Sequence, residues 1–111
     1  MIVSTVMYQN QPDATFDMAY YCNRHIQLVR RLLGDVLKGV AVERGVGSAN
    51  SPAPYVAMGR LWFDSVETFQ AALAAHGPAL IADIPNYTNT KFTIQVSEIE
   101  LAEEPSAKAA R

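Results

Sequence analysis

Residues 16–29 have the sequence FDMAYYCNRHIQLV, which predicts an amphipathic helix near the start of the chain, ending close to Gly34. Apolar side chains recur at offsets of three and four, so they share one face of the helix. They are Met18, Tyr21, Cys22, Leu28, Val29 and Leu32, with His25 among them. The other face is predicted to be solvated and carries Tyr20, Asn23, Arg24, Gln27, Arg30 and Arg31. A titratable imidazole in the middle of an apolar stripe is the main functional question that the sequence raises.

The rest of the chain supplies four strands and a second helix. Apolar and β-branched runs predict strands at residues 2–8, 36–44, 55–63 and 90–101. The second helix is expected to begin at the capping-box sequence DSVE (residues 64–67) and to stop at Gly77 and Pro78. One or two further turns are expected over residues 79–84, ended by Pro85. The order β-α-β-β-α-β is the ferredoxin-like pattern, an α+β fold with a four-stranded antiparallel sheet and both helices on one face. Residues 1–102 are predicted to form this domain, and residues 103–111 a flexible C-terminal tail.

One layer of helices leaves the other face of the sheet uncovered. Strand alternation offers two sets of apolar side chains for that face, Val40 and Val42 or Val56, Met58 and Trp62, and the sequence does not decide between them. Either set leaves apolar residues exposed, which is typical of an interface. We therefore expect a homodimer in which two copies pack through the open sheet face with two-fold symmetry.

Composition and charge exclude several classes of partner. The chain has 111 residues and a net charge of −2, without the basic footprint of nucleic-acid binding. It has no apolar stretch of the ~18 residues that a membrane helix needs. The first twelve residues do not resemble a signal peptide, so a cytoplasmic protein is expected. Cys22 is the single cysteine and is expected to be a small buried residue. Two separated histidines predict no metal site, and no cofactor is expected.

Four short motifs resemble the EthD family, which is named for a protein associated with ethyl tert-butyl ether degradation. They are FDxxYYxxxH (residues 16–25), YVAM (55–58), DSVExF (64–69) and ADIPNYT (82–88). The resemblance covers residues 2–101 and implies a dimeric α/β barrel in which two ferredoxin-like sheets face each other. The family usually has a proline two residues after the histidine, where this chain has Gln27. Because proline kinks or ends a helix, Gln27 is predicted to let the helix continue more regularly.

His25 is the best candidate for a catalytic residue. An imidazole can take and return a proton near neutral pH, which suits enolisation, cyclisation, isomerisation or dehydration. Tyr21, one turn earlier on the same face, is its candidate partner, by hydrogen-bonding His25 or by polarising a substrate carbonyl. The alternative is that the two side chains satisfy each other, or a backbone group, inside the core.

Seven further residues are candidates for ligand binding: Asn10, Met58, Arg60, Trp62, Asp83, Asn86 and Tyr87. Those in loops are predicted to close the open end of a cavity between helices and sheet, although Asn10 and Asn86 also suit turns. Because an unpaired charge is costly to bury, the Arg60 side chain is expected to reach solvent or to contact a carboxylate or a ligand anion. Met58 and Trp62 are also typical of a core or a dimer interface. His76 is expected to end the second helix.

Two classes of function follow. The first is an EthD-like protein that processes a small molecule of catabolism or secondary metabolism, by cofactor-free proton transfer at a hydrophobic pocket. The second is a non-enzymatic dimeric protein that binds a hydrophobic metabolite or assists a partner oxygenase. Proteins with a similar dimeric barrel suggest two further functions. One is haem binding with His25 as the axial ligand, and the other is cofactor-free monooxygenase activity. The sequence names no substrate and leaves open whether the protein is an enzyme.

Overall fold

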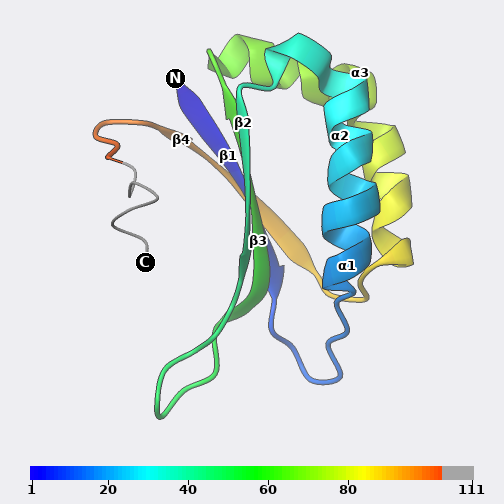
Figure 1. The fold of residues 1–111 in the computed structure, drawn as a ribbon, viewed down its shortest axis with the longest axis vertical. Helices are drawn as coiled ribbons and strands as arrows, with labels where there is room; N and C mark the ends of the chain where they lie inside the picture. The colour runs from blue at the N-terminus through cyan, green and yellow to red at the C-terminus, as the bar shows by residue number, and fades with distance from the viewer. Residues whose placement is uncertain (104–111) are drawn as a thin grey trace.

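The computed structural model describes residues 1–103 and has the predicted β-α-β-β-α-β order (Figure 1). The strands are β1 (Ile2–Gln9), β2 (Gly39–Arg44), β3 (Tyr55–Phe63) and β4 (Phe92–Glu98), which form one antiparallel sheet in the order β2-β3-β1-β4. The helical segments are α1 (Met18–Tyr20), η1 (Tyr21–His25), α2 (Ile26–Leu33), η2 (Gly34–Val36), α3 (Val66–Asp83) and η3 (Ile84–Asn86). The ferredoxin-like prediction is confirmed. Of the predicted tail, residues 104–111 lie outside the described residues.

Figure 1 shows the helices on one face of the sheet and the opposite face uncovered. The strand register assigns the side chains to these faces, because directly paired residues share a face. On β1, Ser4 pairs with Leu61 and Val6 with Gly59 on the helix side. The uncovered face carries Val3, Thr5 and Met7 of β1 with Met58, Arg60 and Trp62 of β3.

The strand register also shows which of the two predicted sets of apolar side chains lies on the uncovered face of the sheet. Val40 and Val42 pack on the helix side, whereas Met58 and Trp62 belong to the uncovered face. Val56 does not follow them, because it packs against the buried cluster around Tyr8, beside a register shift between β1 and β3. The helix side has two buried clusters. The first is aliphatic and aromatic (Ile2, Val29, Leu33, Phe63, Phe69 and Ala72) and the second is largely aromatic (Tyr8, Tyr21, Ile26, Ala57 and Tyr87).

The first helix is less regular than predicted. Residues 21–25 form a π-helical turn in which the Ile26 N–H donates to the Tyr21 carbonyl, five residues earlier. The Gln27 side chain donates to the Cys22 carbonyl at 3.2 Å. The π-turn precedes Gln27, and the helix then continues through Gln27 as a regular α-helix to Leu33, as predicted. The π-turn keeps Tyr21 and His25 both buried, with their ring planes only 15° apart.

The second helix is longer than predicted. α3 continues through Pro78 to Asp83, because Pro78 lies on the exposed side of the helix, where loss of one backbone hydrogen bond is met by solvent. Its N-cap is Ser65, whose hydroxyl accepts from the Thr68 N–H at 3.1 Å, and not Asp64. His76 therefore lies inside the helix and does not end it. The unbroken helix carries Asp83 to the level of His25.

Some strand ends also differ from the prediction. β2 begins at Gly39 because residues 34–36 form a 3-10 turn, and β4 spans residues 92–98. Cys22 is half-buried and not fully buried. Within the described residues, no helix is both long enough and apolar enough to span a bilayer.

Candidate functional site

The centre of the site is a hydrogen-bonded contact between two helical segments of the same layer. His25, at the end of the π-turn, is buried, and its Nδ1 lies 2.8 Å from Oδ2 of Asp83, the last residue of α3. The side chains of His25 and Asp83 are 8% and 15% exposed, so water screens this contact weakly. The two residues are 58 positions apart in the sequence.

Two further donors hold the Asp83 carboxylate. Tyr20 donates its hydroxyl to Oδ1 at 2.7 Å, and Asn86 donates its side-chain amide to the same oxygen at 2.9 Å. Burial raises the pKa of Asp83, but the hydrogen bonds from Asn86, His25 and Tyr20 outweigh it, so the pKa lies below its usual value. The carboxylate is therefore ionised at neutral pH and can only accept hydrogen bonds.

The network fixes the tautomer of His25. Since the Asp83 carboxylate only accepts, Nδ1 of His25 carries the hydrogen, and in the neutral ring the lone pair lies on Nε2. Among the described residues, Nε2 has no hydrogen-bond partner, yet no fully buried side-chain nitrogen or oxygen is left unpaired. Nε2 is therefore accessible, and His25 lines the cavity that separates the helices from the sheet.

This cavity has a volume of about 110 Å³. Its lining comes from β1, β3 and β4 on the sheet side and from η1, α2 and α3 on the helix side. Most of the lining is aliphatic or aromatic: Val6, Ile26, Val29, Leu61, Phe69, Leu73, Leu80, Ile81, Ile84, Phe92 and Ile94. No Lys or Arg of the described chain lines it. The cavity therefore suits a small and uncharged hydrophobic molecule.

Two tyrosines, Tyr21 and Tyr87, pack against His25 at one end of the cavity, and Tyr8 packs against both of them. The Tyr87 ring centre lies 4.7 Å from that of His25, and the Tyr21 ring stacks on His25 at 5.4 Å. The hydroxyls of Tyr8 and Tyr87 are hydrogen-bonded at 2.8 Å. Burial raises the pKa of Tyr8, Tyr21 and Tyr87 well above the usual value, so all three stay protonated and can donate hydrogen bonds.

Gly59 makes room for this cluster. It lies on the helix side of β3, directly below the Tyr21 hydroxyl, and a Cβ atom at this position would overlap that oxygen. Any other residue at position 59 would displace Tyr21 from the His25 ring.

Of the residues that the sequence singled out, His25, Tyr21 and Tyr87 line the cavity. Asp83 and Asn86 do not line the cavity: Asp83 contacts Nδ1 of His25, and Asn86 donates to the Asp83 carboxylate. The end of α3 and the turn after it thus support the histidine.

The other candidates lie elsewhere. Asn10 is exposed and donates to the Ala53 carbonyl at 2.8 Å, which ties two loops together. Met58, Arg60 and Trp62 are on the uncovered face, where the Arg60 guanidinium stacks on the Trp62 ring at 5.1 Å. They do not share a site with His25.

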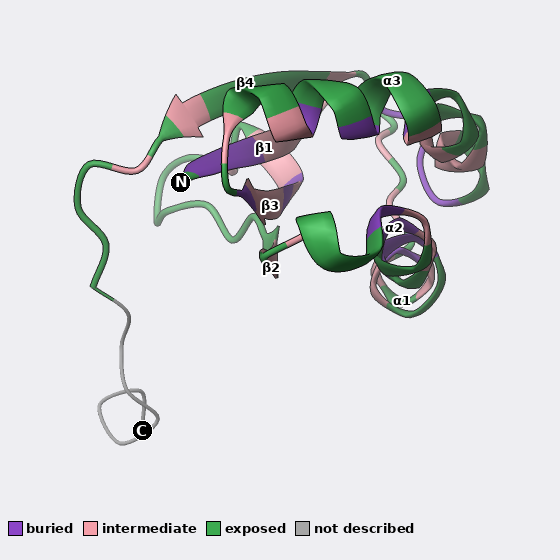
Figure 2. Ribbon diagram, turned by 90° about the horizontal axis from the view of Figure 1, so that it is seen from above, coloured by how far each residue is buried: buried purple, intermediate pink, exposed green. Residues whose placement is uncertain are grey.

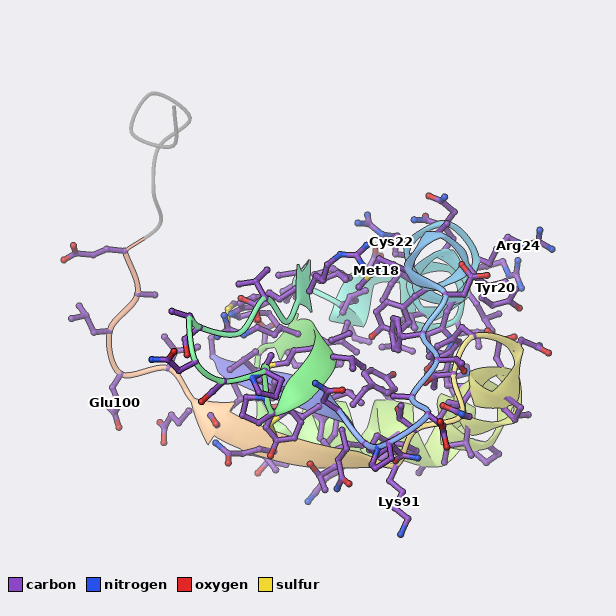
Figure 3. The ribbon with its side chains drawn as sticks, turned by 90° about the horizontal axis from the view of Figure 1, so that it is seen from below. Met18, Tyr20, Cys22, Arg24, Lys91 and Glu100 are labelled. Carbon is purple, nitrogen blue, oxygen red and sulfur yellow. The ribbon has the colours of Figure 1, made fainter. Side chains whose placement is uncertain are left out.

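Four residues of the site were not predicted: Ser4, Tyr8, Tyr20 and Gly59. Tyr20 was predicted to be solvated, and this is wrong because its hydroxyl binds Asp83. Figure 3 shows Tyr20 and Arg24 on the side of the helix away from Met18 and Cys22, and the Arg24 guanidinium lies 5.7 Å from the Tyr20 ring. Strand alternation places Ser4, Val6 and Tyr8 on the same face of β1. This pattern could have identified Ser4 and Tyr8 as residues of the site.

Among the described residues, no three His, Cys, Asp or Glu side chains come together in a geometry that could hold a metal ion.

Comparison with known proteins places this arrangement in context. The EthD domain matches residues 10–91. An EthD-like protein from Ralstonia eutropha JMP134 is 38% identical, with a TM-score of 0.86 over 92% of this chain and 94% of that one. An EthD family protein from Bacillus halodurans C-125 is 23% identical, with a TM-score of 0.62 over 89% of this chain and 99% of that one. No functionally curated protein matches the chain.

The fold extends to more distant proteins. A structure described as a putative antibiotic biosynthesis monooxygenase from Deinococcus radiodurans is 16% identical, with a TM-score of 0.51 over 94% of this chain and 97% of that one. At this identity the similarity concerns the fold alone.

Gly59→Ala should destabilise the protein by about 1–3 kcal/mol, because the added methyl group forces Tyr21 out of a packed site. Gly77→Ala is the matched control on the cavity wall, since its Cβ would meet only the flexible end of Leu73 at 3.3 Å and alanine favours a helix. Urea unfolding of both variants measures the difference. Equal stability of the two variants would contradict the role given to Gly59.

Asp83→Asn should lower the free energy of unfolding at pH 7 by about 1–3 kcal/mol, because it places an amide donor against the His25 N–H. The folded-state pKa of Asp83 is lowered, so its stabilisation is fully present above the ordinary carboxyl pKa and is lost as the pH falls through the folded-state value. The stability difference from the wild type should therefore shrink in acid.

Unfolding curves measured from pH 7 down to pH 2 check this expectation. Asp64→Asn is the control, because Asp64 is 64% exposed and lies 3.8 Å from Lys38. A difference between Asp83→Asn and wild type that stays constant with pH would show that the Asp83 charge is not involved.

Proposed function

This chain belongs to the EthD family, and from that premise we propose that it processes a small hydrophobic molecule by cofactor-free proton transfer, with His25 as the base. One observation carries the proposal. The Nδ1 of His25 is bound by an ionised carboxylate, whereas Nε2 has no partner among the described residues and borders an apolar cavity. A structural histidine in a closed core would have both ring nitrogens satisfied.

Asp83 is the positioning residue in this scheme. It holds His25 in the tautomer whose Nε2 lone pair faces the cavity, and its negative charge stabilises the imidazolium that forms when Nε2 takes a proton. Tyr20 and Asn86 in turn fix the carboxylate. The base is therefore oriented by two layers of hydrogen bonds.

Tyr21 and Tyr87 supply the hydrogen-bond donors that act together with the base. Because Tyr21 and Tyr87 stay protonated beside His25, their hydroxyls can donate to a substrate oxygen on which negative charge develops. A β,γ-unsaturated ketone would lose an α C–H proton to Nε2, so that the C–H electrons form a new C=C bond and the C=O π electrons move onto the oxygen. When the imidazolium returns the proton to the γ-carbon, the C=O bond forms again and the C=C bond has moved into conjugation without any net oxidation.

The haem alternative does not fit the cavity. A space of about 110 Å³ is comparable to the roughly 150 Å³ cavity that holds benzene. A haem, with four pyrrole rings, is several times larger. The space beside His25 instead favours a compound of about one ring.

The family is one of dimeric α/β barrels, which implies a homodimer. We assign the contact to the uncovered sheet face, whose centre carries Met7, Met58 and Trp62 between polar neighbours. Arg60 flattened on Trp62 gives this face a planar, semi-apolar surface that a second copy can match. The cavity lies on the other side of the sheet.

His25→Ala should abolish proton transfer, with a loss of about 10²–10⁴-fold. The assay follows the replacement of α-hydrogens of one-ring ketones by deuterium in D₂O, using NMR. His76→Ala, which removes the other histidine from the middle of α3, should keep the wild-type rate. Ketone binding by the wild type without faster exchange than buffer would favour the non-enzymatic binding protein and reject the catalytic role.

Trp62→Glu should convert the dimer into a monomer, because it places two new charges at the centre of the sheet contact. Light scattering coupled to gel filtration measures the mass. Lys91→Glu is the control, since Lys91 is exposed and points outward (Figure 3). A wild-type mass of one chain at micromolar concentration would overturn the predicted dimer.

A further inference from the structure

Three residues that line the cavity are also widely exposed: Leu73 and Ile81 of α3 and Ile94 of β4. Their exposed fractions are 42%, 56% and 44%, whereas Val29 and Phe69 of the same lining are buried. Figure 2 shows a similar contrast within the sheet, because β1 is largely buried and β4, at the sheet edge, is mostly exposed. The exposed lining residues mark an opening of the cavity, which we call the α3–β4 mouth.

Helical geometry places this mouth on the flank of α3 away from His25. Asp83 contacts His25, and Ile81 precedes Asp83 by two positions on the same helix. Side chains two positions apart point roughly 200° apart around a helix axis. Leu73, Gly77 and Ile81 recur at every fourth position and follow one side of α3. One flank of α3 therefore holds the histidine, and the other borders the mouth.

A row of paired residues connects the His25 end of the cavity to the mouth. Val6 of β1 pairs with Gly59 of β3 on one side and with Ile94 of β4 on the other. Gly59 lies directly below the hydroxyl of Tyr21, whose ring stacks on His25. Two strand spacings, roughly 10 Å, separate Gly59 from Ile94. A ligand whose oxygen lies at the Tyr21 hydroxyl can extend over about this distance before it reaches the mouth.

The path from Tyr21 to the mouth is apolar. Its floor is Val6 and Ile94, and α3 covers it with Gly77 and Ile81. No Asp, Glu, Lys or Arg of the described chain lines the cavity. A polar group on this path would lose its contact with water, whereas each CH₂ group would be stabilised by leaving water. A charged group fits only beyond Ile94, where solvent begins.

We propose that the α3–β4 mouth is a subsite for the apolar chain of the ligand, whose carbonyl oxygen lies at Tyr21 and His25. The substrate class is a ketone with one polar end and an unbranched chain of several carbons. The chain leaves the cavity between Ile81 and Ile94. The inference rests on the proposed function and names its substrate class.

A series of methyl ketones tests the subsite in the wild-type protein. Butan-2-one, hexan-2-one and octan-2-one have the same carbonyl end and differ only in chain length. Each added CH₂ group should tighten binding about two- to fourfold, because it leaves water for the apolar path. NMR titration gives the dissociation constants. An affinity that does not rise with chain length, or no detectable binding of any of the three, would overturn the subsite.

A charge placed at the mouth tests where the chain ends. The probe is 7-oxooctanoate, which has a carboxylate in place of the last methyl group of octan-2-one. Ile94→Lys should tighten its binding about two- to fivefold and Ile94→Glu should weaken it by a similar factor, as expected for one exposed ion pair. Ile81→Lys and Ile81→Glu repeat the test from the helix side. Val66→Lys and Val66→Glu are the controls, because Val66 of α3 is 40% exposed and does not line the cavity.

The results separate this subsite from the proposed function. Equal changes for the Lys and Glu variants, or changes as large at Val66, would reject the subsite. So would a lower oligomer mass for Ile94→Glu in light scattering, because it would show that a second copy covers the mouth. His25-dependent deuterium exchange that is insensitive to chain length and to these variants would reject the subsite and retain the proton-transfer function. Binding that depends on chain length and on the Ile94 charge, without exchange, would support the subsite and reject proton transfer.

Discussion

The contact between His25 and Asp83 determines how the rest of the site is arranged. It joins the end of the π-turn to the end of α3 at 2.8 Å and so fixes the two helical segments relative to each other above the sheet. The contact depends on two departures from regular structure. One is the π-turn, which buries Tyr21 and His25 together, and the other is the continuation of α3 through Pro78. Without the second, Asp83 would not be on the helix that faces His25.

The periodicity of the sequence was sufficient for the fold and insufficient for the site. Alternation and helical spacing depend on local burial, so they predicted the order of elements and the bounds of β3. Helical spacing could not reveal the π-turn at residues 21–25. The one extra residue in this turn leaves the apolar residues around it apolar, so the sequence pattern looks the same as that of an α-helix. The sequence predicts a stop at Pro78 because the missing N–H of proline removes a helical hydrogen bond, but the sequence does not show that solvent can satisfy the freed carbonyl.

The site residues show the same limit in another form. His25 and Tyr21 were predicted because they share a helix face, which is a local property. The role of Asp83 depends on a contact across 58 positions, and no local pattern indicates which carboxylate meets the histidine. Tyr20 was placed on the solvated face, yet its hydroxyl reaches Asp83 because the end of α3 covers that side. Met58, Arg60 and Trp62 lie in a strand whose faces could be distinguished only from the pairing register.

The register of β1 explains how one strand serves two purposes. Ser4, Val6 and Tyr8 face the cavity, whereas Val3, Thr5 and Met7 face the uncovered side of the sheet. Because the side chains alternate, a dimer contact on one face leaves the cavity on the other face intact. The aromatic rings of Tyr8, Tyr21 and Tyr87 fill most of one end. Selectivity in such a space follows from size and from the few polar atoms that remain.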